Sequence, residues 1–446
     1  MTDSTIGPST TGPSSTGSAP RGASHNGTES TAPGGAGVNF VFLVIYLAGL
    51  SAFGSFVNDM YLPSLPSMCD FFHCQAPTVQ LGLTFGMIGL GLGEVILGPV
   101  SAKYGRKPVL VVTIIIFIVA CIVSIYSPTI HFFIWCRLFQ GIGASGGYFL
   151  ARTIPADFYG GRMLAKTMAI IGAINGIAPA SAPVIGGFIS DAFTWKGTFW
   201  ALAIFATALL AFSPKLKESL PKSRRSTGSL LSTFGRYGQL ARNRRFMIHV
   251  LLKGTALGFL FAYISSAPFI VQTHFKYSQV VFGCIMGANA VFVAAGSMLA
   301  LRFKVLKRAA FVGGIGVMAL TLVEFAMLRW GDSFWAYEIP MVCLLFCLGM
   351  IFTVSNTLAM NEGRANAGGA SALLGLAGYV FGAIVSPLVG IGNVMHSTAW
   401  AFLALGVMVL ASSLLSKRVP ADLEPSAGSP AADSASGAHS ELHKTK

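Results

Sequence analysis

Twelve long apolar runs follow one another along the chain, and they limit its fold more than any other feature of the sequence. A helix needs about 20 apolar residues to cross the roughly 30 Å hydrocarbon core of a bilayer. Only helices and closed barrels pair every backbone polar group inside lipid, and barrel strands alternate polar and apolar residues over about 10 positions. These runs are unbroken instead. The sequence therefore predicts an all-α membrane protein with twelve transmembrane helices.

The spacing of the runs divides the chain into two halves. The predicted spans are 39–61, 77–99, 108–127, 131–155, 165–190, 197–213, 246–272, 278–301, 309–329, 335–358, 366–390 and 396–416. The predicted organisation is a disordered tail (1–38), an N-terminal six-helix half (39–213), a basic linker (214–245), a C-terminal six-helix half (246–416) and a second disordered tail (417–446). Both tails are rich in small and polar residues, which cannot bury enough surface to fold.

Composition excludes the main alternatives to a membrane protein. Hydrophobic residues make up 53% of the 446 positions, charged residues make up 10%, and the mean hydropathy is +0.68. Since a soluble domain carries about 25% charged residues, a cytosolic enzyme and a disordered chain are both excluded. We find no nucleic-acid motif, and the seven cysteines follow no zinc or disulfide framework. The sequence therefore predicts no nucleic-acid partner, no metal and no cofactor.

The basic residues predict the orientation in the membrane. With the N-terminus inside, 24 of the 30 Lys and Arg residues fall in inner segments, 3 fall in outer loops and 3 lie inside spans. Cytoplasmic loops carry an excess of Lys and Arg. We therefore expect a multi-pass protein of the cytoplasmic (plasma) membrane with both termini in the cytoplasm.

The two halves share an internal repeat. A constant offset of 201 residues aligns Gly82 with Gly283, Gly86 with Gly287, Lys103 with Lys304, Arg106 with Lys307 and Lys107 with Arg308. Glycine and basic inner loops are common in membrane proteins, so chance recurrence is the alternative explanation. Five matches at one offset favour duplication, and many secondary transporters enclose their central site between duplicated halves.

The loop after the second span carries the first recognisable motif. It reads Gly98-Pro-Val-Ser-Ala102-Lys-Tyr-Gly105-Arg106-Lys107-Pro108. Gly105 permits a tight turn, and the basic residues hold the loop at the inner face. Together these residues resemble the signature loop of the major facilitator superfamily. That family has an acid where this chain has Ala102, and there the acid helps to latch the cytoplasmic side shut.

Three further stretches resemble the bicyclomycin-resistance-type (Bcr/CflA) drug:proton antiporters of that superfamily. They are Asn58-Asp59-Met60-Tyr61-Leu62-Pro63 in the first span, Arg137-Leu-Phe-Gln140-Gly141 in the fourth, and Ala178-Pro179-Ala-Ser-Ala-Pro183-Val-Ile-Gly186-Gly187 in the fifth. The last is similar to the motif that marks the family's antiporters. The similarity covers roughly residues 40–415 and is strongest in the first half.

The resemblance implies the major facilitator fold and proton-coupled transport by alternating access. It implies a gating role for Gly98, Gly105, Arg106 and Lys107. It also places the fifth span between the two halves, where Pro179, Pro183, Gly186 and Gly187 would bend the helix and permit close packing. Ordinary helix packing is the alternative role for these four residues.

Asp59 and Arg137 are the main candidates for proton coupling. A charge at the centre of a membrane costs about 2.5–3.5 kcal/mol on insertion scales, so such residues usually pair and are rarely incidental. Asp59 ends the first span and Arg137 lies about two turns into the fourth, which places both at a similar depth near the outer face. We expect protonation of Asp59 to release Arg137. The alternative is that Asp59 caps a turn and Arg137 extends to the headgroups.

Glu94 is the third candidate for proton coupling. It lies in the inner part of the second span, where related antiporters often have Gln. It could be a second protonation site, a cation contact, a partner for Lys253 or a structural residue. Arg152 is expected to extend to the headgroups, and Glu324 is expected to be a structural residue near water.

Cys69 and Cys74 lie in the first outer loop on either side of His73. They could form a disulfide on an oxidising side of the membrane, or contribute to a metal site that lacks a fourth ligand. We favour two free thiols.

Two functions are compatible with these observations. We favour a secondary active multidrug exporter, a monomer that exchanges protons for amphipathic small molecules across the lipid bilayer. The alternative is a major facilitator carrier for one defined metabolite, such as a sugar or an organic anion. A cavity rich in hydrogen-bonding side chains would indicate that carrier, and the spans offer only a few, such as Asn175, Asn289 and Asn356. We find no nucleotide-binding loop and no catalytic cluster, so we expect neither an enzyme nor ATP-driven transport.

Overall fold

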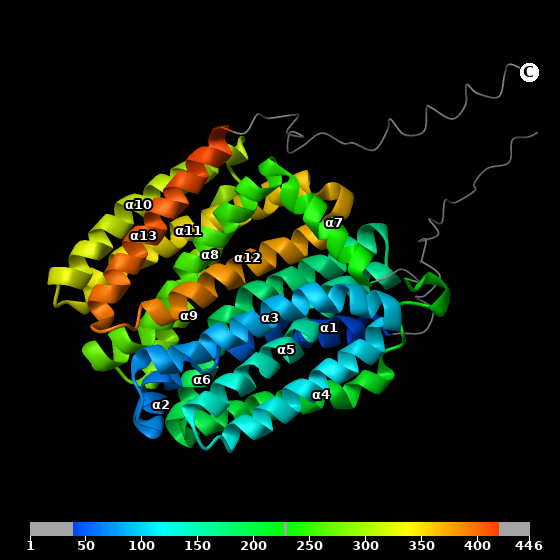
Figure 1. Ribbon diagram of the computed structural model, residues 1–446, viewed down its shortest axis with the longest axis horizontal. Coiled ribbons are helices and arrows are strands. Elements are labelled where there is room, and N and C mark those ends of the chain that lie inside the picture. The colour runs from blue at the N-terminus through cyan, green and yellow to red at the C-terminus, as the bar shows by residue number, and fades with distance from the viewer. Residues whose placement is uncertain (1–38, 227–229, 419–446) are drawn as a thin grey trace, which may run out of the picture.

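A computed structural model describes residues 39–226 and 230–418 and shows a bundle of long helices (Figure 1). The predicted tail over 1–38, and the second predicted tail beyond residue 418, lie outside the described residues. The long helices are α1 (Phe40–Asp59), α3 (Ala76–Tyr104), α4 (Arg106–Ile125), α5 (Ile130–Phe158), α6 (Gly161–Phe212), α8 (Arg244–Pro268), α9 (Gln279–Ala300), α10 (Leu306–Trp330), α11 (Phe334–Glu362), α12 (Ala367–Leu388) and α13 (Val394–Arg418). Two short helices, α2 (Leu65–Phe72) and α7 (Leu230–Arg242), lie in connections.

Helix α6 contains two of the predicted spans. Its 52 residues would extend about 78 Å as one straight helix, which is far longer than a bilayer is thick. The helix breaks at Phe193 and Thr194, and Thr194 has a φ of 60°, a left-handed conformation that a β-branched residue rarely adopts. The segments before and after this break are the fifth and sixth spans.

The twelve predicted spans therefore all lie in helices. Ten segments of the described residues have the length and hydropathy of a membrane span, and one of these is the whole of α6. Helix α5, with Arg137 and Arg152 inside it, supplies the remaining span. The prediction of twelve transmembrane helices in two six-helix halves is confirmed.

The halves meet along two pairs of helices. Helix α3 of the N-terminal half (α1 to α6) packs along α12 of the C-terminal half (α8 to α13), as Figure 1 shows, and α6 packs along α9. Small residues allow this approach. A side chain at Gly283 of α9, for example, would collide with the backbone carbonyl of Pro183 in α6.

We name the two ends of the bundle by the predicted orientation, so the inner end carries Gly105 and the outer end carries Pro63. Hydrogen bonds join the halves near the outer end. The Gln80 amide donates to the Ser265 carbonyl over 2.9 Å, and the Gln272 amide donates to the Pro63 carbonyl over 3.0 Å. A hollow of about 760 Å³ lies beyond them at the outer end and is lined by both halves. These bonds close the bundle between that hollow and its centre.

The linker begins at the inner end of α6 and continues along the inner end of the bundle. Its helix α7 packs against α12, α8 and α3, and so contacts both halves. The amphipathic sequence of α7 suits a helix that lies on a surface rather than across a bilayer.

Candidate functional site

A cavity of about 460 Å³ lies between the two halves. This volume falls in the range of about 300–1,000 Å³ that is typical of small-molecule sites. Helices α1, α6, α8, α9 and α11 line it, mostly with apolar side chains such as Leu257, Leu260, Ile264, Met286, Val293, Leu345 and Phe352. Its polar lining residues are Asp59, Asn175, Lys253, Tyr263, Asn289 and Ser297. Such a surface offers an apolar contact area, one carboxylate and one amine.

The four residues of the predicted antiporter motif lie where α6 passes between the halves. Pro179 and Pro183 line the cavity. A side chain at Gly186 would collide with the backbone carbonyl of Met60, and a Cβ atom at Gly187 would lie 2.7 Å from the carbonyl oxygen of Gln279 in α9. Both glycines therefore permit backbone contacts that a larger residue would prevent.

Asp59 is the last residue of α1 and lies, half-buried, on the wall of the cavity. The structure places the first predicted coupling residue where a substrate or a proton in the cavity could reach it. Asp59 and Arg137 do not form an ion pair within the described chain. Arg137 does bond to Val57 and Asn58, which directly precede Asp59, so the two residues lie at a similar depth in the bundle.

Arg137 instead lies completely buried inside the N-terminal half, away from the headgroups. Its guanidinium donates to the Gln140 side chain over 2.7 Å, to the Asn58 side chain over 3.3 Å and to the Val57 carbonyl over 3.0 Å. It also stacks on the ring of Tyr61, with 4.3 Å between the guanidinium carbon and the ring centre.

The end of α1 explains why Arg137 bonds there and not to Asp59. The last carbonyls of a helix have no partner within the helix, and the Val57 carbonyl is one of them. Arg137 satisfies this carbonyl and the Asn58 amide together. Asp59 is the next residue along the helix, and it projects from a different side into the cavity. Sequence reasoning missed Asn58 and Gln140 as partners, although both stand in the motifs that identified Asp59 and Arg137.

Glu94 is buried on α3 at the contact with the C-terminal half. Its carboxylate packs so closely against α12 that a side chain at Gly375 would collide with it. Arg152 is the basic residue that interacts electrostatically with it. Lys253, which was one expected partner, instead lies over the ring of Phe352 at 5.3 Å and lines the cavity.

Arg152 does not extend toward the headgroups as expected. It is half-buried, donates a hydrogen bond to the Tyr148 hydroxyl and stacks on the Tyr148 ring at 3.9 Å. The expectation was wrong because an aromatic ring one turn earlier and the nearby Glu94 carboxylate hold the guanidinium inside the protein.

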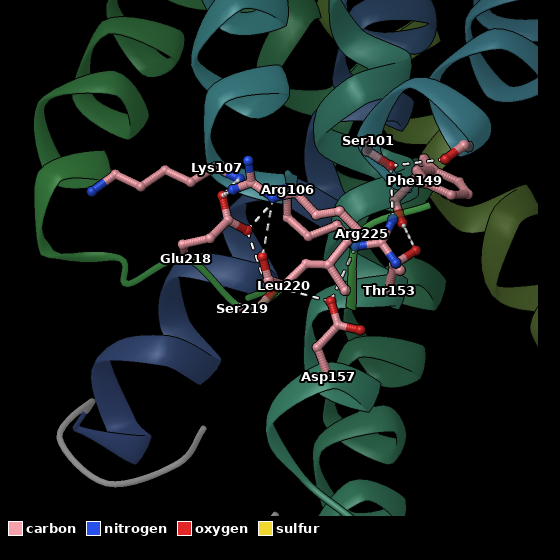
Figure 2. Close-up of polar contacts among 11 residues, drawn as sticks. Ser101, Arg106, Lys107, Phe149, Thr153, Asp157, Glu218, Ser219, Leu220 and Arg225 are labelled. Atoms are coloured by element: carbon pink, nitrogen blue, oxygen red, sulfur yellow. Dashed lines mark hydrogen bonds and ion pairs between the residues drawn. The ribbon is translucent and has the colours of Figure 1, made fainter. Parts of the chain in front are cut away.

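The predicted gating loop forms a polar network with the linker (Figure 2). Gly105 has a φ of 107°, and a Cβ atom there would lie 2.6 Å from the Glu218 carboxylate. That carboxylate accepts from the backbone N–H groups of Arg106 over 2.8 Å and Lys107 over 3.3 Å, so it caps the start of α4. The Arg106 side chain pairs with Asp157 of α5 at 3.1 Å.

The linker thereby supplies an acid beside a loop that lacks one at Ala102. The Ser226 backbone N–H donates to the Ala102 carbonyl over 2.9 Å, and Arg225 lies 3.6 Å from Glu218. Gly98 lies one turn before this network, where a Cβ atom would lie 3.6 Å from the Tyr237 hydroxyl of α7. Sequence reasoning did not identify Glu218, because it lies more than 100 residues from the loop.

A second polar cluster lies inside the C-terminal half. The Asn289 amide donates to the Tyr263 hydroxyl over 2.7 Å and to the Glu338 carboxylate over 2.6 Å. Glu324 of α10 is completely buried and has no hydrogen-bond partner in the described chain. The expectation that Glu324 lies near water is therefore wrong, and Glu338 was not identified from the sequence.

Cys69 and Cys74 are free thiols in the structure. No group of three or more His, Cys, Asp or Glu residues in the described segments is arranged to hold a metal ion. Partial burial raises the pKa of the Cys74 thiol above its usual value.

Two pseudo-equivalent helical halves around a central cavity define a membrane carrier of small molecules. The family model of the Major Facilitator Superfamily matches residues 47–387, and the chain belongs to that family. Its members are carriers and not enzymes, so the chain is a multi-pass membrane transporter.

Relatives and solved structures agree with this assignment. The chain is 35% identical to an uncharacterized MFS-type transporter, YdgK of Bacillus subtilis, over 79% of this chain and 89% of the relative. It is 26% identical to the multidrug resistance protein MdtL of Shigella dysenteriae, over 91% of this chain and 97% of the relative. The fold also matches the partially occluded inward-open xylose transporter XylE of E. coli, with a TM-score of 0.67 at 13% identity over 85% of this chain and 98% of that chain.

Proposed function

We propose that the chain is a proton-driven exporter of amphipathic, drug-like molecules, of the Bcr/CflA type, in the plasma membrane. The observation that carries this proposal is the central cavity, which is large, mainly apolar and has the carboxylate of Asp59 on its wall. Apolar walls accept many amphipathic shapes, because few polar groups fix one orientation. The similarity to proteins named for multidrug resistance supports the same substrate class.

The proposed cycle follows alternating access. An amphipathic molecule enters the cavity from the inner side while the outer bonds between the halves are closed. The halves then rock, the outer bonds open and the molecule leaves. A proton from the outside binds Asp59 and neutralises it, which favours substrate release and the return of the halves. Each charge that moves inward down a 100 mV potential supplies about 2.3 kcal/mol, to which the pH gradient adds.

Reconstituted protein tests the proposal directly. The purified full chain is placed in proteoliposomes with ethidium as the transported probe and an imposed pH gradient. We expect dye to accumulate on the acidic side, at least several-fold over protein-free liposomes, and a protonophore to abolish the accumulation. Protonophore-insensitive equilibration of the dye would exclude proton-driven export. Uptake of a labelled sugar without dye movement would indicate the metabolite carrier instead.

A further inference from the structure

The polar cluster inside the C-terminal half is not explained by the proposed cycle, which uses only Asp59. Four helices build it. Tyr263 comes from α8, Asn289 from α9, Glu324 from α10, and Glu338 with its neighbour Tyr337 from α11. The two glutamates and the two tyrosines lie within electrostatic range of one another.

Three of the four carboxylate oxygens in this cluster have no hydrogen-bond partner among the described residues. They are both oxygens of Glu324, whose exposure is 0%, and Oε2 of Glu338, whose exposure is 7%. The Tyr337 hydroxyl, also buried, has no partner either. A bare carboxylate out of water is very unfavourable, whereas a neutral carboxyl carries its own donor. The geometry therefore fits glutamates that hold protons.

No basic residue of the described chain forms an ion pair with either glutamate. The other titratable groups on the helices around the pair include basic and acidic residues at the inner ends of these helices, namely Arg244 and Arg245 of α8, Lys307 and Arg308 of α10, Glu362 of α11, and Lys417 and Arg418 of α13. The remaining ones, apart from Tyr263 and Tyr337, are His249 and Lys253 of α8, the exposed His274 after α8, Cys284 of α9, Arg329 at the outer end of α10, Cys343 and Cys347 of α11, Tyr379 of α12 and the exposed His396 of α13. Lys253 is ten residues from Tyr263, which is about 15 Å along a helix. Protonation is thus the remaining way to neutralise the pair.

The cluster is connected to the central cavity. Tyr263 and Asn289 both line the cavity, and the Asn289 amide bonds to Tyr263 and to Glu338 at the same time. Glu338 is therefore one hydrogen bond behind the cavity wall. A change in the charge of Glu338 would alter the bond that orients two lining residues.

The internal repeat aligns Glu338 of this cluster with Arg137 in the sequence. The offset of 201 residues that relates Gly82 to Gly283 also relates Arg137 to Glu338. Helices α5 and α11 begin 204 residues apart, so the two residues lie within one turn of each other along the corresponding helices. In the N-terminal half, Arg137 stacks on Tyr61, which lies just after the outer end of α1. In the C-terminal half, Glu338 is linked through Asn289 to Tyr263, which lies near the outer end of α8. One half thus holds a permanent charge and the other an acid that can be neutralised.

We propose that Glu338 and Glu324 form a second proton-binding site, whose occupancy is transmitted to the central cavity through Asn289 and Tyr263. This inference rests on the proposed proton-driven export, and it assigns a proton-binding site to the C-terminal half. A proton from cavity water adds to the Glu338 carboxylate when Asn289 moves aside, forming an O–H bond and removing one negative charge. Loss of that proton restores the charge, which the Asn289 amide then stabilises.

Infrared spectroscopy of the purified full chain tests the site without any transport. Protonated buried carboxyl groups give a carbonyl stretch that is separate from the amide and carboxylate bands. We expect this band in the wild type at neutral pH, and expect Glu338→Gln and Glu324→Gln each to remove part of it. Asp332→Asn changes an exposed acid in the loop between α10 and α11 and should leave the band unchanged. A band that is absent from the wild type, or unaltered in both glutamine variants, would overturn the proposal.

Transport measurements then separate this site from the proposed function. In proteoliposomes, Glu338→Gln should reduce pH-driven ethidium accumulation by about tenfold, a typical coupling between two linked ligands, while ethidium exchange without a gradient continues. Retained exchange shows that the variant is folded. Full pH-driven accumulation in Glu338→Gln would overturn the second site. If the wild type shows no pH-driven transport, the export proposal fails while the infrared result still decides whether the glutamates hold protons.

Discussion

At the scale of single residues, Arg137 shows how a charge is accommodated inside the bundle. A flat guanidinium reaches Val57, Asn58 and Gln140 at once and still stacks on Tyr61. A lysine keeps the charge but has a compact ammonium that cannot make the same set of contacts. Arg137 therefore orders the end of α1 and the residue that follows Asn58, which is Asp59. Any coupling between Arg137 and Asp59 would therefore pass through the end of α1, which Arg137 contacts at Val57 and Asn58.

We predict that Arg137→Lys lowers stability by about 1–3 kcal/mol, since it leaves buried acceptors without a donor. It should also impair pH-driven ethidium efflux despite the retained charge. Asp59→Asn, in contrast, should abolish pH-driven efflux and leave exchange partly intact, because only the titratable group is lost. Thermal unfolding and proteoliposome transport measure the two effects. Wild-type pH dependence in both variants would show that coupling resides elsewhere, with Glu94 the next candidate.

At the scale of helices, α6 determines how closely the halves approach. Gly187 contacts the Gln279 backbone of α9, whereas Gly172, toward the inner end of the same helix, has nothing within 4 Å of a would-be Cβ atom. We predict that Gly187→Leu reduces transport strongly while the protein still reaches the membrane, because the larger side chain holds the outer ends apart. Gly172→Leu is the matched control and should transport normally. Gly186→Leu should also reduce transport, because its side chain would collide with the Met60 backbone just after α1, within the N-terminal half. Normal ethidium efflux by both Gly186→Leu and Gly187→Leu would contradict this role of the motif.

The contact of the linker with the gating loop makes a second prediction at this scale. Glu218→Gln removes the negative charge at the start of α4 and one of the two carboxylate acceptors, which costs about 0.5–2 kcal/mol locally. The linker should open more often, and trypsin should cleave faster after Lys222, Arg224 and Arg225. Cleavage followed by gel electrophoresis measures this. Glu362→Gln, at the end of α11, is the control. Equal cleavage rates in both variants and the wild type would show that Glu218 does not hold the linker.

The sequence predicted the helices far better than the contacts between them. Apolar run length and basic loops located every span, because each helix must satisfy the bilayer by its own composition. The depth of Asp59 and Arg137 also followed from residue counting. Residue counting did not predict the partners of Arg137, the burial of Glu324 or the hydrogen bonds of Glu338. These contacts depend on how α5, α9, α10 and α11 are rotated about their axes. Glu218 shows the same limit, because nothing local in the linker indicates the loop that it caps.

At the scale of the whole molecule, Cys74 reports on the predicted orientation. It lies half-buried in the connection that leads into α3, and its pKa is raised, so less thiolate is present at neutral pH than for an exposed cysteine. We predict that a membrane-impermeant maleimide labels Cys74 in intact cells. Labelling should be slow at neutral pH, and its rate should rise about tenfold for each unit of pH increase until the pH reaches the pKa of the thiol. Because Cys69 is a second half-buried free thiol in the same outer segment, the double variant Cys69→Ser/Cys74→Ser should remove this signal. Labelling only after permeabilisation would reverse the orientation.

The closed outer end makes the last prediction, since alternating access requires this end to open. Ser190 of α6 and Gln279 of α9 bond through their side chains across the two halves. A double variant with Ser190→Cys and Gln279→Cys should form a disulfide under mild oxidation, because the backbones of α6 and α9 approach closely at Gly187, one turn before Ser190. The cross-link would hold the outer ends together, so ethidium efflux should stop on oxidation and return after reduction. The wild type, with its seven cysteines, controls for oxidation elsewhere. Undiminished efflux by fully cross-linked protein would show that substrate leaves by a route that does not separate α6 from α9.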